Sequence, residues 1–401
     1  MTNEKVRVAV TQGDTNGIGY ELIFKTFADP DIFELCTPVV YGSPKAAAYH
    51  NKLLASQATF SIVSNAGEVK DNRLNILTTY DEETKIDIGQ PTAESGLAAL
   101  KALDRAMSDY RDNGYDVLVT TPISKSNTKA DGFAFNGNAG YVETSLGEGN
   151  KTMPILCNEN MKIASVAGDI LMKDVPAAIT KENIKEKAKM LHKSMRRDFR
   201  ISNPRIAVLA LNPGNEPGKE EKEIILPAVN ELADEGVEAF GPYPADEFFG
   251  NGYFNSFDAI LAMYYDQGAI PFKTLSQDTG ILYHAGLPVI FTEPDMTPCY
   301  DAAGKNITDA GALRNAVYMA IDIFRNRVEF DKASANPLKK LYHEKKDDSE
   351  KVRFAIPKKH SGAPFPPKDN APAQKISNDG TADTAQPNEN KADNSAEIKE
   401  V

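Results

Sequence analysis

The residues with the clearest capacity for chemistry stand just after short apolar runs. Lys125 follows Val117–Thr121, at the end of the segment Thr-Thr-Pro-Ile-Ser-Lys, and its ammonium group could hold a phosphate or a carboxylate. If this run is a parallel strand, Lys125 belongs to a loop at a strand carboxyl end, where α/β proteins place active sites. A lone lysine in a loop is more often solvated, so Lys125 alone is weak evidence.

A glycine-rich segment follows the first apolar run, Val6–Thr11. Gly13, Gly17 and Gly19 do not have the dinucleotide-binding spacing G-x-G-x-x-G, and no Gly-Lys-Ser/Thr follows, which excludes a P-loop. The simplest interpretation is a tight turn from a strand into a helix, in which glycine permits positive φ.

Composition limits the classes of partner. The 401 residues are 41% hydrophobic and carry a formal net charge of -12, which disfavours nucleic acid because phosphate binding needs a basic face. The three cysteines, Cys36, Cys157 and Cys299, show no metal-binding or disulfide spacing, so we expect a cytoplasmic protein. Neither a signal-peptide core nor a stretch of 18 apolar residues occurs, so no membrane partner is expected.

The chain alternates β-branched runs with amphipathic helical patterns, which predicts an α/β protein with a largely parallel sheet. The runs expected as buried strands are Val6–Thr11, Thr37–Tyr41, Val117–Thr121, Lys162–Val166, Arg205–Leu211, Ala259–Tyr264 and Pro288–Thr292. Three helices are expected: one near Ala93–Arg111, and two capped by Thr180 and Thr308. Their predicted apolar faces are, in chain order, Leu97, Leu100, Leu103, Met107 and Tyr110; Ile184, Ala188, Leu191 and Met195; and Leu313, Val317, Ile321 and Phe324.

The end of the chain differs from the rest. After Phe365 the only large aliphatic residues are Ile376, Ile398 and Val401, in a stretch rich in Lys, Asp, Asn, Ala and Pro. Such a segment cannot bury enough surface to offset its chain entropy, so residues 365–401 are predicted to be a disordered, solubilising tail. Residues 336–364 are predicted to be a C-terminal extension of the body.

Several segments, in one order from Val6 to Arg327, resemble the 4-hydroxythreonine-4-phosphate dehydrogenase (PdxA) family. They include the turn Gly-Asp-Thr-Asn-Gly-Ile-Gly, the Lys125 segment, Gly-Pro-Tyr-Pro-Ala-Asp-Glu-Phe-Phe, and Gly-Leu-Pro with a following Asp-Ala-Ala-Gly-Lys. The resemblance implies a two-lobed α/β fold like that of isocitrate and isopropylmalate dehydrogenases. It also implies a homodimer whose active site is completed across the interface. The body would be residues 1–335, with lobe 1 about 1–125 plus 290–335 and lobe 2 about 126–289.

The resemblance further implies an activity, the NAD-dependent oxidation of 4-phosphooxy-L-threonine or a related phosphorylated hydroxy acid. Decarboxylation follows, in pyridoxal phosphate biosynthesis, and a divalent metal (zinc, magnesium or cobalt) assists. Carried over by position, the site residues are catalytic Asp246 and Asp266, substrate-binding Lys273, Lys125 and Glu143, and cofactor-binding Asn212, Asp301 and Gly304. The position of Glu143 comes from aligning Phe135–Thr144 with the family's Phe-x-Gly-His-Thr-Glu through an insertion, which puts Tyr141 and Val142 at the His-Thr pair.

The chain departs from the family pattern where the metal and the substrate phosphate are held. Asp169, Gly214 and Tyr265 stand at the three metal-binding histidine positions. Phe291 replaces an arginine that holds phosphate, and Leu282 replaces a substrate-binding asparagine. One carboxylate and one phenol are a poor substitute for three imidazoles. A catalytically silent paralogue that acts as a binding or regulatory module is therefore the alternative to a working dehydrogenase.

Overall fold

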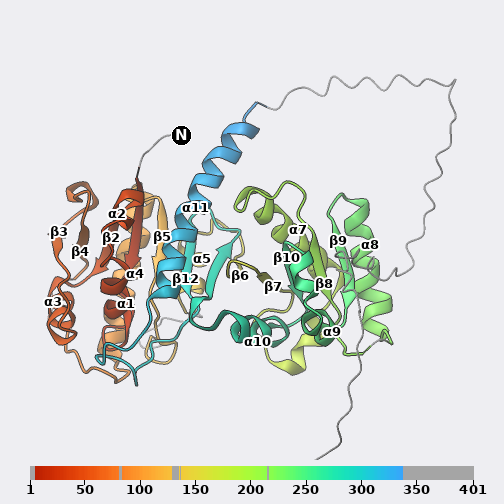
Figure 1. Cartoon of the computed structure of the whole chain (residues 1–401), viewed down its shortest axis with the longest axis horizontal. Helices are drawn as coiled ribbons and strands as arrows, with labels where there is room; N and C mark the ends of the chain where they lie inside the picture. Colours follow the sequence, from red (N-terminus) through yellow and green to blue (C-terminus); the bar gives the residue numbers. More distant parts are fainter. Residues whose placement is uncertain (1–4, 81–83, 129–134, 136, 215, 337–401) are drawn as a thin grey trace, which may run out of the picture. The chain divides into compact units, whose positions relative to one another are not determined.

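The computed structural model describes residues 5–80, 84–128, 135, 137–214 and 216–336. Within them lies a 12-stranded sheet in the order β3-β4-β2-β1-β5-β12-β11-β6-β7-β10-β8-β9 (Figure 1). The strands are β1 (Val6–Thr11), β2 (Cys36–Gly42), β3 (Phe60–Val63), β4 (Leu74–Thr78), β5 (Val117–Thr120), β6 (Met153–Cys157), β7 (Lys162–Ser165), β8 (Ile206–Leu209), β9 (Ala239–Tyr243), β10 (Ala259–Ala262), β11 (Ile281–Ala285) and β12 (Ile290–Pro294).

The sheet is largely parallel, as predicted. From β3 to β12 every neighbouring pair is parallel, and so is every pair from β7 to β9. Antiparallel pairing is confined to the centre, where β11 pairs with β12 and β6, and β6 pairs with β7. The fold class is therefore confirmed, whereas the lobe boundaries stay a prediction.

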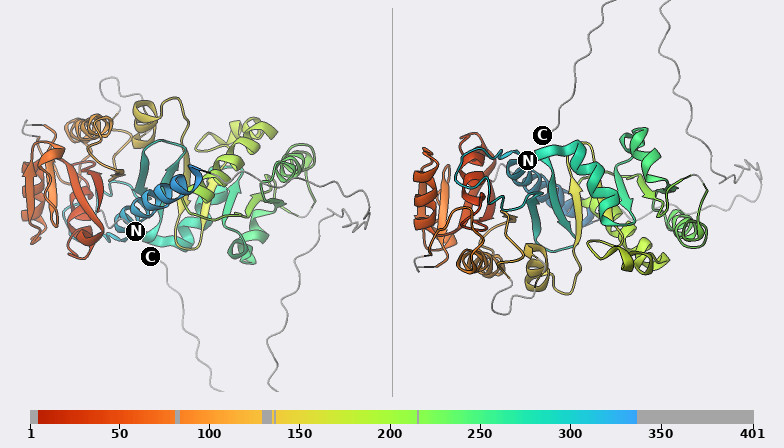
Figure 2. Two further views of the ribbon diagram at one scale, coloured as in Figure 1. Left: turned by 90° about the horizontal axis from the view of Figure 1, so that it is seen from above. Right: turned by 90° about the horizontal axis from the view of Figure 1, so that it is seen from below.

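Helices cover both faces of this sheet (Figure 2). The α-helices are α1 (Gly19–Thr26), α2 (Ile32–Leu35), α3 (Pro44–Leu53), α4 (Ala93–Arg111), α5 (Gly137–Leu146), α6 (Val175–Ala178), α7 (Lys181–Arg197), α8 (Leu226–Asp234), α9 (Ala245–Gly250), α10 (Tyr265–Ser276) and α11 (Gly311–Ser334). Short 3₁₀ turns lie at Ala66–Glu68, Met172–Asp174, Tyr253–Ser256 and Gln277–Thr279, and a π-helical turn lies at Glu221–Ile225.

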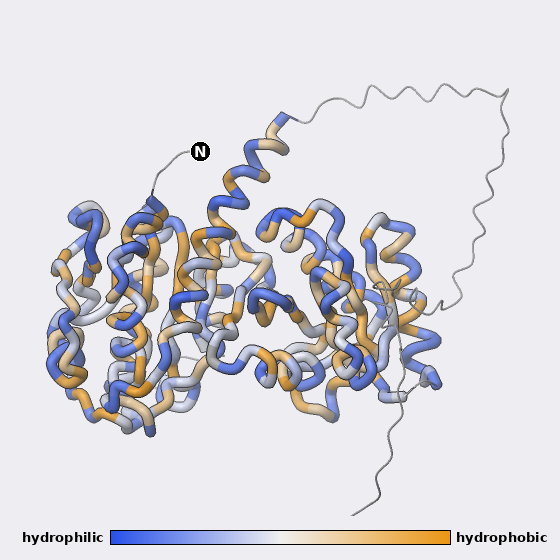
Figure 3. The backbone as a smooth tube through the Cα atoms, in the orientation of Figure 1, coloured by the Kyte–Doolittle hydropathy of each residue, from blue (hydrophilic) through white to orange (hydrophobic). Residues whose placement is uncertain are grey.

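Alternation along β1 assigns the helices to faces. Val8 and Val10 pack in the core that contains Leu313 of α11, whereas Ala9 packs in the core that contains Leu103 of α4. Successive strand residues point to opposite faces, so α11 and α4 lie on opposite sides of the sheet. Figure 3 shows hydrophobic stretches within the body. The strands β1, β2 and β5 are buried at nearly every residue, as expected of strands that are covered on both faces.

Two of the three predicted helices form as expected, and the third begins later. Thr180 caps α7, because its Oγ1 accepts a hydrogen bond from Asn183 N at 3.2 Å. Thr308 does not cap α11, which begins at Gly311; the Thr308 backbone N–H donates to the Glu21 carboxylate at 2.8 Å. Leu97 was also misplaced: it is 48% exposed, since α4 approaches the sheet through alanines such as Ala102.

The glycine-rich segment after β1 is the tight turn that its glycines predicted. Gly13 has a φ of +67°, and a Cβ there would lie 2.3 Å from Thr121 Oγ1. The buried carboxylate of Asp14 closes the turn by accepting hydrogen bonds from Asn127 Nδ2 at 2.6 Å and Tyr300 Oη at 2.7 Å. These contacts join loops that are far apart in the sequence.

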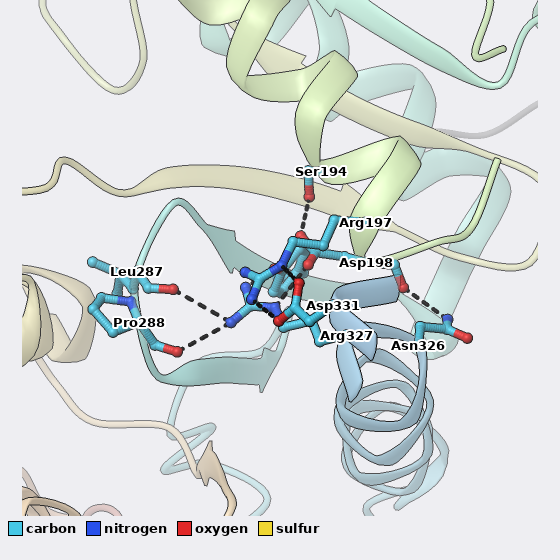
Figure 4. A network of polar contacts seen from close by, with 9 residues as sticks. Ser194, Arg197, Asp198, Leu287, Pro288, Asn326, Arg327 and Asp331 are labelled. Carbon is cyan, nitrogen blue, oxygen red and sulfur yellow. Dashed lines mark hydrogen bonds and ion pairs between the residues drawn. The ribbon is translucent and has the colours of Figure 1, made fainter. Parts of the chain in front are cut away.

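A buried ionic group, which we call the Arg327 network, ties α11 to α7 and β11 (Figure 4). Arg327 Nε donates to Asp198 Oδ1 at 2.7 Å, and Arg327 Nη2 donates to Tyr283 Oη at 2.9 Å. Arg327 Nη1 reaches the carbonyl oxygen of Pro288 at 3.1 Å, and Ser194 donates to the other oxygen of Asp198. Most polar atoms of the group are therefore satisfied inside the body.

Among the described helices, none is long and apolar enough to span a membrane. The predicted extension and tail lie outside the described residues beyond Asn336.

Candidate active site

Three positions singled out from the sequence follow neighbouring parallel strands. Asp169 follows β7, Tyr265 follows β10 and Gly214 follows β8, and these strands adjoin in the order β7-β10-β8. The carboxyl ends of parallel strands meet at one edge of a sheet, which is where ligands bind in α/β proteins.

Asp169 and Tyr265 line one cavity of about 330 Å³, which we call the candidate cavity. Its wall is mainly apolar, with contributions from Met153, Pro154, Leu156, Ile163, Val166 and Leu282. Gly214 is not among the lining residues; it has a φ of +88°, and nothing lies within 4 Å of the point where a Cβ would stand.

The two basic side chains predicted to bind substrate are both engaged with carboxylates. Lys125 Nζ lies 3.6 Å from Asp169 Oδ2, and both side chains are more than half exposed. Lys273, on α10, lies 2.6 Å from Asp295 Oδ1, directly after β12. The structure thus brings Lys125 to the rim of the candidate cavity through Asp169. It pairs Lys273 with Asp295, a residue that the sequence did not single out.

Tyr265 stands in an anionic environment. Partial burial and nearby negative charges raise the pKa of Tyr265 to about 12. Burial has the largest effect, and the carboxylates of Asp295, Asp169 and Asp266 add to it. The phenol is therefore neutral near pH 7, and a neutral phenol is a weak metal ligand. Asp266 lies next to Tyr265 in the first turn of α10 and is exposed.

Asp246 and Glu143 do not line the candidate cavity. Asp246 is exposed in the first turn of α9, after the edge strand β9. Glu143, on α5, accepts a hydrogen bond from Thr152 N at 2.8 Å and lies 3.6 Å from Lys151 Nζ. The contacts of Glu143 fasten α5 to the start of β6.

The structure separates the residues of α5 between the candidate cavity and the core. Ala139 and Gly140 line the candidate cavity, whereas Val142 is buried in a core and Tyr141 Oη donates to Asp104 at 2.7 Å. The match of this segment to the family's Phe-x-Gly-His-Thr-Glu therefore stays a prediction.

The three predicted cofactor residues are likewise outside the candidate cavity. Asn212 Nδ2 donates to Glu221 at 3.0 Å, and Glu221 also accepts from the backbone N–H groups of Leu211 and Asn212. Burial would raise the pKa of Glu221, but these hydrogen bonds outweigh it and lower that pKa. Asp301 is exposed, and Gly304, with a φ of +75°, packs near Leu53.

The donor set does not fit a divalent metal held by three protein side chains. Of the three positions, Gly214 has no side chain, Tyr265 is a neutral phenol and Asp169 is paired with Lys125. Across the described part of the chain, no group of three or more His, Cys, Asp or Glu side chains is placed to hold a metal ion. A carboxylate alone is a weak site for such an ion.

A cluster beside the candidate cavity was missed. Glu293 accepts hydrogen bonds from Thr120 Oγ1 at 3.0 Å and Asn138 Nδ2 at 3.2 Å, and lies 2.8 Å from His284 Nε2. We call these four residues the Glu293 cluster. His284 is 2% exposed and stacks on Phe291. Only the pairing of β11 with β12 brings His284 to Glu293, and spacing alone does not give that pairing.

Burial of Glu293 favours its neutral form, but its partners reverse the effect. Burial would raise the pKa of Glu293, whereas the charge of His284 and the hydrogen bonds of the cluster outweigh it and lower that pKa. The cluster therefore holds a carboxylate anion, supplied with three donors, near the cavity wall.

Comparison with known proteins agrees with this architecture. The family model described as "Pyridoxal phosphate biosynthetic protein PdxA" matches residues 34–320. The 4-hydroxythreonine-4-phosphate dehydrogenase of Bacteroides thetaiotaomicron is 48% identical, over 88% of this chain and 98% of that protein. The enzyme of the same name from a Sulfurihydrogenibium species is 34% identical, over 80% of this chain and 99% of that protein.

Solved structures give the same result. The crystal structure of 4-hydroxythreonine-4-phosphate dehydrogenase from Klebsiella pneumoniae superposes with a TM-score of 0.69 at 26% identity, covering 81% of this chain and 99% of that one. The enzyme from Burkholderia phymatum gives a TM-score of 0.67 at 26% identity, with 80% and 99% covered. With the family match spanning most of the body, the chain belongs to the PdxA family of pyridoxal phosphate biosynthetic proteins.

Proposed function

We propose that the chain is an NAD-dependent dehydrogenase that oxidises 4-phosphooxy-L-threonine or a related hydroxy acid in the candidate cavity. One observation carries the proposal. Asp169 and Tyr265, from loops after different strands, meet in one cavity at the strand carboxyl ends. The names of the relatives supply the reaction, because both curated proteins are called 4-hydroxythreonine-4-phosphate dehydrogenase.

Oxidation of a secondary alcohol needs a hydride acceptor and a group that takes the hydroxyl proton. NAD would supply the acceptor when bound, and the exposed carboxylate of Asp301 is free to accept hydrogen bonds from ribose hydroxyls. Asn212 is less available, since its amide is bound to Glu221. Asp266 is better placed than Asp246 to take the proton, because its neighbour Tyr265 lines the cavity.

A second function is favoured by a specific observation. The residues at the three metal positions do not fit a divalent ion, so a reaction that depends on such an ion has lost its support. A catalytically silent paralogue, acting as a binding or regulatory module on the same frame, is therefore the second candidate.

The two candidates are separated by following NADH formation at micromolar enzyme. The substrates are 4-phosphooxy-L-threonine and its phosphate-free counterpart 4-hydroxy-L-threonine, each with EDTA or with added zinc or magnesium. NADH formation with either substrate, unchanged by EDTA and reduced by Asp266→Asn, supports the proposal. No NADH with either substrate rejects the dehydrogenase and leaves the silent paralogue.

Family membership also leads us to propose a homodimer located in the cytoplasm, with no nucleic-acid or membrane partner. Light scattering coupled to size-exclusion chromatography measures the first of these directly. A monomer at micromolar concentration would contradict a shared active site.

A further inference from the structure

The wall of the candidate cavity contains a basic side chain, that of Lys187 on α7. Among the described residues of the wall, Lys187 is the single lysine or arginine. Its side chain is half-buried, and within the described part of the chain no ion pair or hydrogen bond joins it to another side chain. The positive charge of Lys187 is therefore available to a ligand.

The lysines of α7 lie on different sides of the helix. Lys181, Lys185 and Lys189 are spaced four residues apart, so they share one side, and all three pair with carboxylates in and just after α8. Lys187 is two residues from both Lys185 and Lys189, which places it on nearly the opposite side of the helix. The helix thus presents Lys187 to the cavity, whereas the other three lysines serve the contact with α8.

Two hydroxyl groups belong to the same wall. Thr152 lies just before β6, and Ser165 is the last residue of β7. Thr152 Oγ1 is buried and has no hydrogen-bond partner among the described residues, although the backbone N–H of Thr152 donates to Glu143 at 2.8 Å. A buried hydroxyl without a partner is costly, so an acceptor atom supplied by a ligand would stabilise it.

The lysines predicted from the sequence to bind substrate are less available than Lys187. Lys125 lies 3.6 Å from the carboxylate of Asp169, and Lys273 lies 2.6 Å from that of Asp295. Either lysine would have to share its charge between that carboxylate and a ligand anion. A phosphate group carries up to two negative charges and three acceptor oxygens, which suit an unpaired ammonium group with hydroxyl donors beside it.

We propose that Lys187 binds the phosphate group of a phosphorylated hydroxy acid in the candidate cavity, with Thr152 and Ser165 as hydroxyl donors. This inference rests on the proposed function for the substrate class, and it names the residues that hold the phosphate. A ligand without a phosphate makes no contact with Lys187, so its affinity does not depend on this residue.

The test compares the twin ligands 4-phosphooxy-L-threonine and 4-hydroxy-L-threonine, which differ only in the phosphate. Wild type and Lys187→Ala, labelled at the methionine methyl groups, are titrated with each ligand and followed by NMR. The reporter is Met153 in the cavity wall, and its signal is assigned with Met153→Leu. We expect Lys187→Ala to weaken binding of the phosphorylated twin at least about tenfold, the effect of losing one charge-assisted hydrogen bond. The affinity for the phosphate-free twin should not change.

Lys189→Ala is the matched control, because it removes the same side chain from the same helix but breaks an exposed ion pair with Glu235. It should leave both affinities unchanged. Equal weakening of the two twins in Lys187→Ala would mean that Lys187 contacts a group other than the phosphate, and it would overturn the inference. Equal effects of Lys187→Ala and Lys189→Ala would overturn it too.

Thr152→Val supplies a second measurement, since valine has nearly the same shape as threonine and lacks the hydroxyl. Because Thr152 Oγ1 has no partner among the described residues, the variant should be as stable as wild type in urea unfolding. It should nevertheless bind the phosphorylated twin about fivefold less tightly, the effect of one neutral hydrogen bond. A loss of stability without a loss of affinity would show a structural role and overturn the assignment of Thr152.

The outcomes separate this inference from the proposed function. Binding of 4-phosphooxy-L-threonine that depends on Lys187, without NADH formation, refutes the dehydrogenase and keeps the inference. NADH formation from this substrate with a KM that Lys187→Ala leaves unchanged supports the dehydrogenase and overturns the inference. An unperturbed Met153 signal with both twins counts against both.

Discussion

Two pairs of opposite charges in this body are built in opposite ways. In the Arg327 network, the Arg327 and Asp198 side chains are 9% and 5% exposed and lie 2.7 Å apart. At the rim of the candidate cavity, Lys125 and Asp169 are 55% and 67% exposed and lie 3.6 Å apart. The first pair is supported by Tyr283, Ser194 and backbone carbonyl oxygens, whereas among the described residues no further polar contact supports the second.

The difference shows which residues maintain the frame, by which we mean the folded body that surrounds the candidate cavity. A buried charge must stay paired, since leaving one partner alone in the interior is costly, whereas an exposed pair is replaceable. The PdxA frame can therefore persist in this chain while Gly214 and Tyr265 stand at metal positions. Removing residues from each region in turn tests this view.

Arg327→Ala should have the largest effect on stability. It strands Asp198 and leaves Tyr283 without its donor, so the free energy of unfolding should fall by about 3–5 kcal/mol. Urea unfolding measures this loss. Arg325→Ala, on an exposed position of the same helix, is the control and should change stability by less than about 0.5 kcal/mol. Similar losses of stability in both variants would show that the Arg327 network makes no special contribution to the frame.

Gly13→Ala and Gly214→Ala compare the stability cost of adding a Cβ at two glycines with positive φ. Gly13 belongs to the frame, and Gly214 stands at a family metal position. At Gly13 a Cβ would meet Thr121 Oγ1 at 2.3 Å and Pro122 O at 2.6 Å. The backbone conformation and the clash together should cost about 2–4 kcal/mol. At Gly214 nothing lies within 4 Å, so only the φ of +88° is penalised, by about 1–2 kcal/mol. Thermal unfolding ranks the two, and a larger loss at Gly214 would contradict the ordering.

Placing histidine at the three family metal positions tests whether these positions still lie close enough together to form one site. If the loops after β7, β8 and β10 still converge, Asp169→His, Gly214→His and Tyr265→His together should raise zinc affinity about 100-fold, or about 2.7 kcal/mol. Isothermal titration calorimetry measures the gain, with Tyr265→His alone as the control. No gain in the triple variant would mean that the three positions do not share one site.

The Glu293 cluster should stabilise the folded protein, as the Arg327 network does, and its contribution should depend on pH. Its donors lower the pKa of Glu293, so the ionised form adds stability that is fully present above the unfolded carboxyl pKa, about 4.3. This contribution is lost as pH falls through the folded pKa. Glu293→Gln should thus be less stable than wild type by about 1.5 kcal/mol at pH 7, with the gap narrowing below pH of about 4.3. A pH-independent gap in urea unfolding would contradict the assignment.

The sequence pattern predicted seven of the twelve strands and missed β3, β4, β6, β9 and β11. β9 contains Gly241 and Pro242, and β6 contains Pro154; these residue types weaken the strand pattern. The site followed a related limit. Asp169 and Tyr265 were identified from the family resemblance, whereas the contact of His284 with Glu293 depends on the register of β11, a strand that was not predicted.

Lys125→Ala should have the smallest effect. An exposed ion pair gains little Coulomb energy in water and loses side-chain entropy, so its removal should change the free energy of unfolding by less than about 0.5 kcal/mol. Asp169→Asn should behave alike, and high salt should not separate either variant from wild type. Urea unfolding at two salt concentrations measures this. Because Lys125 stands at the cavity rim, the same variant should weaken the binding of a carboxylate ligand. A stability loss as large as that of Arg327→Ala would contradict the prediction and show that the cavity rim belongs to the frame.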